Sequence, residues 1–383
     1  MKKHNRKIIY VAGFLFSIPM ALTSYINSSF LESYINAYYV SITYVTASVI
    51  TILAMLKMPA ILTRLGNRRA TLFFGVLIFL SYLGLAFAQK PSVVVSAFIL
   101  YFVFTNFIIA SLDIFIEDFS GKSAVGGIRG FYLMVINSAW VVAQMISGSI
   151  IAKSSFRGIY LFSAGLTILF SIIFIFFLRG FKDPTYRKVP VLKTVKVFIK
   201  NKNISKIYVL NFLLRFFFAW MIIYTPIYLH EYMNFGWSQI GVIFSIMLLP
   251  FVLLEFPLGK LSDRIGEKEM LFMGFLISAF FTLLIPFLNE SSLWLWAGVL
   301  FMTRVGAATI EVMSESYFFK SINVEDDAEI SFFRNTMPLS FIIAPLVAIP
   351  ILMFIPSFKY IFFVLAAILF AGAFVSLRLR DVK

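Results

Sequence analysis

Long apolar runs separated by short polar segments make up most of the chain. Twelve such runs can be marked, each of 18 to 23 residues, and a helix needs about 20 mostly apolar residues to cross a bilayer. The runs carry no charged face, which favours spanning helices over amphipathic surface helices, and β-barrel strands would be shorter and alternating. The predicted helices cover Ile8–Phe30, Tyr38–Leu56, Thr71–Ala88, Val93–Phe115, Phe131–Ala152, Ile159–Leu178, Ile207–Leu229, Ile240–Leu258, Met270–Leu288, Leu293–Val312, Phe332–Phe354 and Tyr360–Leu377.

The composition agrees with this pattern. Hydrophobic residues make up 61% of the chain and charged residues 13%, against roughly 45–50% and about 25% in soluble domains. These values exclude a water-soluble fold. We therefore expect an all-α membrane protein with twelve transmembrane helices.

Several kinds of chemistry are excluded by residue types that the chain lacks. It has no Cys and only two His, which removes disulfides, Cys/His zinc sites and thiol nucleophiles. No G-x-x-x-x-G-K-[ST] segment is present, so the phosphate cradle of a nucleotide-driven pump is missing. We expect no metal, no cofactor and no enzymatic activity, with energy supplied by gradients.

The basic residues predict the orientation of the helices. If both termini are cytoplasmic, 27 of the 33 Lys and Arg residues fall in cytoplasmic segments and 4 in outer loops. Such an asymmetry is typical of the positive-inside rule. It also accounts for most of the net charge of +15, so nucleic-acid binding is not needed to explain that charge. We expect a multi-pass protein of a bacterial plasma (inner) membrane.

A polar central segment divides the chain into two groups of six predicted helices. This segment, 180–206, contains Pro184, Pro190 and many Lys residues, which is typical of a linker that faces anionic lipid. The predicted organisation is an N-terminal six-helix bundle at 1–179, a basic cytoplasmic linker at 180–206 and a C-terminal six-helix bundle at 207–383.

Polar positions recur between the two groups at a nearly constant offset. The offset stays between 198 and 200 residues for Tyr25 with Tyr224, Arg64 with Arg264, Gly66 with Gly266, Asp113 with Glu311, and Glu117 with Glu315. Duplication of a six-helix unit explains this spacing. Two parallel halves could enclose a midplane cavity that opens alternately to either side of the membrane.

Two loops carry a resemblance to a known family. The segment Gly259–Lys268 resembles the G-x-L-x-D-R-x-G-x-[KR] signature of the major facilitator superfamily. The segment Pro59–Arg69 is similar, but Pro59 and Thr63 replace the usual Gly and Asp. Glu117 to Gly130 also resembles the acidic-to-Arg-Gly pattern that follows the fourth helix in this family. With the twelve helices and the duplication, the resemblance covers essentially the whole chain.

The resemblance implies two pseudo-symmetric bundles and a cytoplasmic gate. Asp263 would help to lock the cytoplasmic side when the cavity faces outward, and Thr63 would make the matching latch weaker. We hypothesise that Glu117 pairs with Arg64 or Arg129, and that Glu315 pairs with Arg264 or Arg334. Simple topology and loop packing remain the alternative explanation of these charges.

Two arginines lie within predicted spans, where charged groups are costly. The resemblance implies that Arg215 and Arg304 line the cavity. Guanidinium groups without an adjacent acid would favour an anionic or carboxylate-bearing substrate. The alternative is that each arginine pairs with an acid on a neighbouring helix and has a structural role. On the fourth helix, Asn106 occupies the position that corresponds to Arg304.

Acidic groups near the cytoplasmic ends are candidates for proton coupling. Asp113 and Glu311 could load and release protons in a desolvated cavity, or they could be gate acids close to water. Other polar groups that could reach the cavity are Tyr25, Asn137, Trp140 and Gln144. The last three share a face of the fifth helix by spacings of three and four, although helix–helix hydrogen bonds explain such residues equally well.

The leading interpretation is a secondary active transporter, or a facilitator, that works by alternating access. We expect its partners to be a small-molecule substrate, the lipid bilayer and protons, with no nucleic acid, and we expect a monomer. The open alternatives are an efflux or uptake carrier for neutral or hydrophobic compounds, a membrane-embedded lipid-modifying enzyme, and a non-transporting receptor or scaffold on the same fold.

Overall fold

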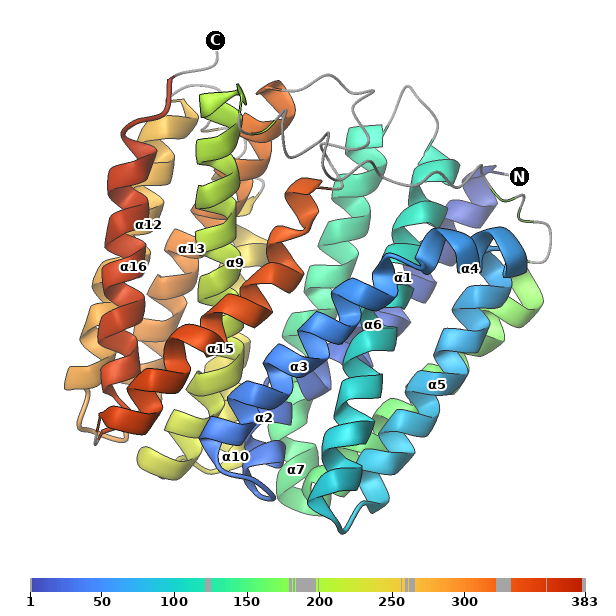
Figure 1. Cartoon of the computed structure of the whole chain (residues 1–383), viewed down its shortest axis with the longest axis horizontal. Coiled ribbons are helices and arrows are strands. Elements are labelled where there is room, and N and C mark those ends of the chain that lie inside the picture. Colours follow the sequence, from blue (N-terminus) through green and yellow to red (C-terminus); the bar gives the residue numbers. More distant parts are fainter. Residues whose placement is uncertain are drawn as a thin grey trace. The chain divides into compact units, whose positions relative to one another are not determined.

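The chain divides into two compact units in a computed structural model (Figure 1). Unit 1 comprises Met1–Lys188 with Gly236–Gly241, and unit 2 comprises Val189–Phe235 with Val242–Lys383. The structure describes residues 2–120, 125–178, 181, 183, 198, 200–255, 257–258, 261, 266–321, 332–355 and 357–380, with only the backbone for 2–5, 117–120, 125–130 and 133. The domain boundaries expected at 179 and 206 stay predictions.

Unit 1 is built from helices alone in its described part. α1 packs against α7 and α6, and α5 packs against α6 and α7. A buried apolar core lies between α1 and α7, where Ala21 and Leu22 meet Ala143 and Ile159. The helices are α1 (Lys2–Ser24), α2 (Asn27–Glu32), α3 (Ala37–Met55), α4 (Met58–Leu65), α5 (Asn67–Phe87), α6 (Pro91–Ser120) and α7 (Val125–Phe177).

The first predicted helix is interrupted, which corrects the expectation of one continuous span at Ile8–Phe30. α1 ends at Ser24, and α2 begins at Asn27 after a turn. The Thr23 hydroxyl donates to the carbonyl of Pro19 at 2.9 Å, and the Ser24 hydroxyl donates to that of Met20 at 2.6 Å. Such back-bonding to carbonyls one turn earlier tends to bend helices. The break places Tyr25 between two helical segments.

α7 contains two predicted helices joined without a long loop. Its 53 residues are interrupted at Ser155, where φ is 61° and ψ is −175°. A non-glycine residue with positive φ is uncommon and marks a sharp local change of the backbone. The break lies between the predicted helices Phe131–Ala152 and Ile159–Leu178, so the connection is shorter than the sequence suggested.

Unit 2 places α9 against three other helices. α9 packs against α13, α15 and α16, and α12 packs against α13 and α16. The elements are α9 (Lys202–Ile227), η1 (Tyr228–Tyr232), α10 (Trp237–Leu253), α12 (Glu267–Leu284), η2 (Ile285–Phe287), α13 (Leu293–Ser321), α15 (Thr336–Phe354) and α16 (Tyr360–Ser376). The first turn of α10, up to Gly241, is assigned to unit 1.

The sequence repeat has a local structural counterpart at two glycines. Gly66 precedes α5 with φ 75° and ψ 152°, and Gly266 precedes α12 with φ 98° and ψ 153°. This backbone conformation is essentially restricted to glycine. Two glycines 200 residues apart therefore begin corresponding helices with the same kind of turn, which agrees with duplication of a six-helix unit.

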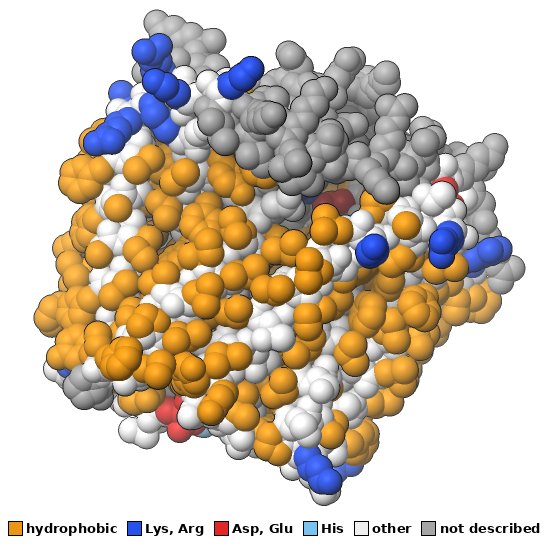
Figure 2. All heavy atoms as spheres, viewed as in Figure 1, with side chains coloured by type: hydrophobic (Ala, Val, Ile, Leu, Met, Phe, Trp, Pro, Cys, Tyr) orange, Lys and Arg blue, Asp and Glu red, His pale blue; other side chains and the backbone are white. Residues whose placement is uncertain are grey.

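The surface is largely apolar, as expected for a protein embedded in lipid. Figure 2 shows hydrophobic side chains over the faces of the helices and Lys and Arg side chains near their ends. Within the described residues, nine helices are long and apolar enough to cross a membrane, and two shorter apolar helices are Trp237–Leu253 and Tyr360–Ser376. The all-α membrane class is confirmed, whereas the count of twelve spans stays a prediction.

Candidate functional site

An ion pair inside unit 2 joins two helices that are distant in sequence. Arg215 Nη1 on α9 lies 2.8 Å from Glu311 Oε1 on α13, and Arg215 Nη2 lies 3.7 Å from Glu315 Oε1. The Arg215 and Glu311 side chains are 18% and 22% exposed, so their attraction is screened less than that of a surface pair. Spacing by four residues on α13 brings both carboxylates to the same guanidinium group.

This geometry corrects one expectation for the arginines. Arg215 has an acid within hydrogen-bonding distance, whereas the sequence suggested a guanidinium group without one. The packing of α9 against α13 brings these residues together, and a sequence does not reveal that packing. The hypothesis for Glu315 named Arg264 and Arg334 as partners; its described contact is with Arg215.

Arg304 lies on α13 and is almost completely buried at 1% exposed. Its guanidinium carbon is 4.7 Å from the centre of the Phe217 ring and 5.7 Å from that of Phe218. The guanidinium carbon of Arg215 is also 5.6 Å from the Phe218 ring. Cations are attracted to aromatic faces, and the attraction is stronger away from water. The two arginines predicted for the site therefore share an aromatic neighbour on α9.

A hydrogen-bonded chain that the sequence did not predict lies one helical turn from the ion pair. Thr336 Oγ1 on α15 donates to Asn211 Oδ1 at 2.8 Å, and Asn211 Nδ2 donates to Ser314 Oγ at 3.2 Å. All three side chains are buried. Asn211 precedes Arg215 by four residues, so a polar residue on the same helical face was the signal available in the sequence.

In unit 1, the counterparts on α6 are arranged differently. Asn106 Nδ2 donates to the carbonyl of Phe102 in its own helix at 2.8 Å, and its side chain is half-buried. Asp113 is also half-buried. At the position that corresponds to Arg304, the side chain of Asn106 is thus hydrogen-bonded to the backbone of α6.

The candidates on α1 and α7 contact one another. Gln144 is buried and its Nε2 donates to the carbonyl of Ala21 at 2.6 Å. The rings of Tyr25 and Trp140 meet edge to face with centroids 6.3 Å apart, and Asn137 is half-buried one turn before Trp140. Gln144 therefore links α7 to α1 by a hydrogen bond, and its part in substrate binding stays a prediction.

A buried cluster of hydroxyl and amide groups in unit 1 also escaped the sequence analysis. The hydroxyls of Thr23 and Tyr101 lie 2.9 Å apart, and Tyr160 donates to Asn27 Oδ1 at 3.0 Å. The ring of Tyr82 packs between them, 5.2 Å from that of Tyr101 and 6.3 Å from that of Tyr160. These residues come from five helices, so only tertiary structure brings them together.

Several gate candidates fall outside the described part of the chain. Asp263 and Arg264 are among the residues that are not described, and the side chains of Glu117 and Arg129 are not described either. Arg64 is exposed in the last turn of α4. Arg334 is exposed two residues before α15.

Acidic side chains lie at the beginnings of α5 and α12. Asp183 Oδ1 accepts the backbone N–H of Asn67 at 2.6 Å at the start of α5. At the start of α12, the buried Glu267 accepts from Lys320 Nζ at 2.6 Å and from Ser316 Oγ at 3.0 Å. Carboxylates stabilise the positive end of a helix dipole. Asp183 reaches α5 from the segment that follows α7, a contact that the sequence analysis did not predict.

Apolar helices, an internal repeat and an ion pair between helices are typical of membrane transport proteins. The sequence profile of the Major Facilitator Superfamily matches residues 9–246 and 209–383. Because these matches extend over nearly the whole chain, the chain belongs to this family. Membership of this family indicates that the protein is a membrane transporter and not an enzyme.

One curated relative shares part of the sequence at low identity. An uncharacterised MFS-type transporter of Methanocaldococcus jannaschii is 24% identical over 182 residues, which is 46% of this chain and 47% of the relative. The chain thus spans about half the length of that curated relative. Solved structures match over more of the chain.

Three solved transporters have a similar fold. The nucleoside transporter NupG has a TM-score of 0.76 at 12% identity, covering 97% of this chain and 98% of its own. A bacterial homologue of the iron transporter ferroportin, in an inward-facing state, has a TM-score of 0.76 at 14% identity, with 98% of both chains covered. A POT family transporter in complex with 5-aminolevulinic acid has a TM-score of 0.78 at 12% identity, covering 97% and 95%. At these identities the likeness concerns the fold alone.

Proposed function

We propose that the protein is a secondary active transporter that moves a small anionic or carboxylate-bearing solute by alternating access. The observation that carries this proposal is the placement of Arg215, whose guanidinium group already holds a carboxylate at 2.8 Å. A substrate carboxylate can form the same charge-assisted hydrogen bonds. Arg304 is the second candidate cation, because it is buried against the Phe217 and Phe218 rings and Arg215 contacts the same Phe218 ring.

The same ion pair supports a route for proton coupling. When a substrate carboxylate takes the place of Glu311 at Arg215, Glu311 loses its counter-ion in surroundings with little water. A proton on Glu311 then restores neutrality. Substrate and proton would therefore bind together and leave together, and Asp113 is the corresponding candidate in unit 1.

The solved structure of a POT family transporter with 5-aminolevulinic acid supplies a first probe, because that ligand is a small carboxylic acid. It belongs to that transporter, and its use for this chain rests on the proposal. Sugars, neutral amino acids and inorganic anions complete the panel. We expect carboxylates to raise the midpoint of thermal unfolding of the purified protein, and to enter proteoliposomes that contain it.

The matched variants are Arg304→Gln and Arg157→Gln. Both arginines stack on a phenylalanine ring, since the guanidinium carbon of Arg157 is 4.4 Å from the Phe87 ring centre, but Arg157 is exposed and outside the candidate site. We expect Arg304→Gln to abolish the stabilisation by carboxylates and Arg157→Gln to keep it. Full carboxylate binding by Arg304→Gln would exclude Arg304 as a substrate ligand, and full binding by both Arg304→Gln and Arg215→Gln would overturn the anionic-substrate proposal.

A carrier for neutral or hydrophobic compounds is the second candidate. The ion pair between Arg215 and Glu311 favours it, because the charge of this arginine is already balanced within unit 2. In that case both residues stabilise the packing of α9 against α13. Uptake of neutral members of the panel, with no response to carboxylates, is the expected result. Failure to transport any member while a panel compound still binds would favour a receptor.

The gate and the orientation remain part of the proposal. Asp263 is proposed to lock the cytoplasmic side together with Arg264, with Glu117, Arg64 and Arg129 in the corresponding loop of the N-terminal half, and Arg334 beside Glu315. Both termini are proposed to be cytoplasmic in a bacterial plasma membrane, with the protein acting as a monomer. Charge reversal at Asp263 should shift the equilibrium between the outward-facing and inward-facing states. An unchanged transport rate would contradict a role of Asp263 in the gate.

A further inference from the structure

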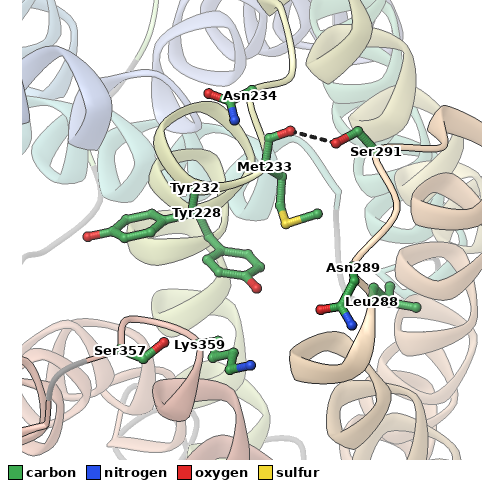
Figure 3. Close-up of a pocket in the computed structure, with 9 residues that line it drawn as sticks. All are labelled: Tyr228, Tyr232, Met233, Asn234, Leu288, Asn289, Ser291, Ser357 and Lys359. Carbon is green, nitrogen blue, oxygen red and sulfur yellow. Dashed lines mark hydrogen bonds between the residues drawn. The ribbon is translucent and has the colours of Figure 1, made fainter.

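A pocket of about 370 Å³ lies in unit 2 where α9 ends. Three separate chain segments line the pocket, as Figure 3 shows. One is η1 with the residues after it, one connects η2 to α13, and one precedes α16. The lining residues are Tyr228, Tyr232, Met233, Asn234, Leu288, Asn289, Ser291, Ser357 and Lys359. None of them belongs to the candidate substrate site.

The lining combines one cation with hydrogen-bonding groups. Lys359 is the charged residue among the nine, and Asn234, Asn289, Ser291 and Ser357 supply amides and hydroxyls. Figure 3 shows the ammonium end of Lys359 directed toward the segment that carries Asn289. No acidic side chain lines the pocket, and Lys359 forms no ion pair with another described residue. The nine lining residues therefore carry one positive charge in total.

The walls are held in place before any ligand binds. Tyr228 stacks on Phe358 with centroids 6.0 Å apart and an angle of 11° between the rings, and Tyr232 stacks on the same ring at 4.8 Å. Ser291 Oγ donates to the carbonyl of Met233 at 2.9 Å, the bond drawn in Figure 3. A site that is already ordered loses less entropy when a ligand binds.

The backbone around the pocket is unusual in two ways. α9 widens into a π-helix at Tyr228–Tyr232, a feature that frequently occurs at functional sites. Asn234 has a φ of 56°, a left-handed conformation that Asn tolerates better than most residues. Together they turn the chain so that residues on both sides of Met233 line the same space.

We propose that this pocket binds the phosphate group of a small ligand, with Lys359 as the counter-ion. A lysine ammonium is a compact point charge that suits phosphate, whereas the arginines of the candidate substrate site suit planar carboxylates. Asn289 and Ser357 can donate hydrogen bonds to the phosphate oxygens. The volume lies near the lower end of ligand pockets, about 300–1,000 Å³, which fits a head group or a small phosphate ester.

The phosphate can come from a lipid or from solution. The residues next to the pocket in sequence include Trp294, which is 74% exposed, and Phe354, which is 79% exposed. An exposed Trp side chain at a helix end is typical of the level of lipid head groups. A phospholipid head group and a soluble phosphate would use the same lysine, so the two sources must be separated by experiment.

The test uses the full-length protein in a neutral detergent and measures the midpoint of its thermal unfolding. Inorganic phosphate is titrated in one arm, and short-chain phosphatidylglycerol in the other, with short-chain phosphatidylcholine as its zwitterionic control. Saturable stabilisation by phosphate supports a soluble ligand. Saturation by phosphatidylglycerol alone supports an anionic lipid. Absence of saturation in both arms would overturn the proposal.

The key variant is Lys359→Gln, and its matched control is Lys90→Gln. Lys90 lies in the α5–α6 loop, which corresponds to the segment around Asn289 in the repeat, and it is exposed. Losing a charge-assisted hydrogen bond should weaken the apparent affinity about tenfold in Lys359→Gln, whereas Lys90→Gln should bind as the wild type does. Equal affinity in the two variants would refute the role of Lys359.

A second variant keeps the test decisive if Lys359→Gln does not fold. Asn289 is exposed, so Asn289→Asp changes the charge with almost no change of shape. A carboxylate in the lining would repel phosphate and neutralise Lys359, and we expect saturable binding to disappear. Unchanged binding by Asn289→Asp would count against the pocket as the phosphate site.

Discussion

Arg215 on α9 and Glu311 on α13 form a contact of 2.8 Å between helices that begin 91 residues apart in the chain. The pair is four-fifths buried within unit 2. Removing one partner of a buried pair leaves the other charge without compensation, which costs more than the pair contributes. In the proposed mechanism, a substrate carboxylate or a proton compensates the charge that is left.

The first prediction concerns Glu311→Gln. The amide keeps the shape of the side chain but cannot take up a proton, so we expect uptake driven by a proton gradient to be lost while substrate exchange across the membrane continues. Transport into proteoliposomes, with and without an imposed gradient, measures both. Glu269→Gln is the control, since Glu269 is an exposed carboxylate in the first turn of α12, outside the candidate site and the proposed gate. Gradient-driven uptake that persists in Glu311→Gln would exclude this carboxylate as the proton carrier.

The second prediction uses a pair of substitutions to measure the ion pair. We expect Arg215→Gln alone to lower the free energy of unfolding by about 1–3 kcal/mol, below the range for fully buried pairs because water still reaches both groups. The double variant Arg215→Gln with Glu311→Gln should recover part of this loss. Melting of the purified variants provides the comparison, and strictly additive losses would show that the two side chains are not coupled.

The third prediction concerns the hydrogen bond from Thr336 to Asn211. Thr336→Val leaves the Asn211 carbonyl oxygen without this donor in a buried place, and we expect a loss of about 1–3 kcal/mol. Thr46→Val is the control, because the Thr46 hydroxyl is exposed and bonds only within α3. The midpoint of thermal unfolding should fall for Thr336→Val and stay near the wild-type value for Thr46→Val. If both variants lowered the midpoint equally, the buried hydrogen bond of Thr336 would contribute no more to stability than the exposed one of Thr46.

The helices could be predicted because the bilayer sets their length. Helix α3 (Ala37–Met55) begins and ends within one residue of the predicted bounds. The prediction works because the length of an apolar run must match the thickness of the hydrocarbon core. The internal repeat could also be recognised from the sequence, because a backbone constraint fixes the residue type at corresponding positions. Gly66 and Gly266 occupy a backbone conformation that other residues avoid, so both copies of the duplicated unit retain glycine there.

Local breaks and tertiary contacts could not be predicted in the same way. The interruption after Ser24 depends on hydroxyl bonds to the backbone, and the π-helix at Tyr228–Tyr232 follows an unbroken apolar run. The partner of Arg215 depends on which face of α13 packs against α9. Periodicity places Glu311 and Glu315 on a common face, but it does not tell which helix that face meets.

The fourth prediction concerns the turn before α5. Gly66→Ala forces a side chain into a backbone region where it is strained, which costs of order 1–3 kcal/mol. Its Cβ would also lie 2.6 Å from Asp183 Oδ2, so the carboxylate that caps Asn67 must move. We expect a lower melting midpoint and faster hydrogen exchange in the first turn of α5.

The control for that variant is Gly165→Ala in α7. Apart from the adjacent residues and the backbone of its own helix, no heavy atom lies within 4 Å of the added Cβ there, and alanine favours a helix over glycine by about 1 kcal/mol. We expect Gly165→Ala to raise the melting midpoint slightly, opposite in sign to Gly66→Ala. If both variants shifted the midpoint in the same direction, neither backbone strain nor displacement of Asp183 would explain the effect of Gly66→Ala.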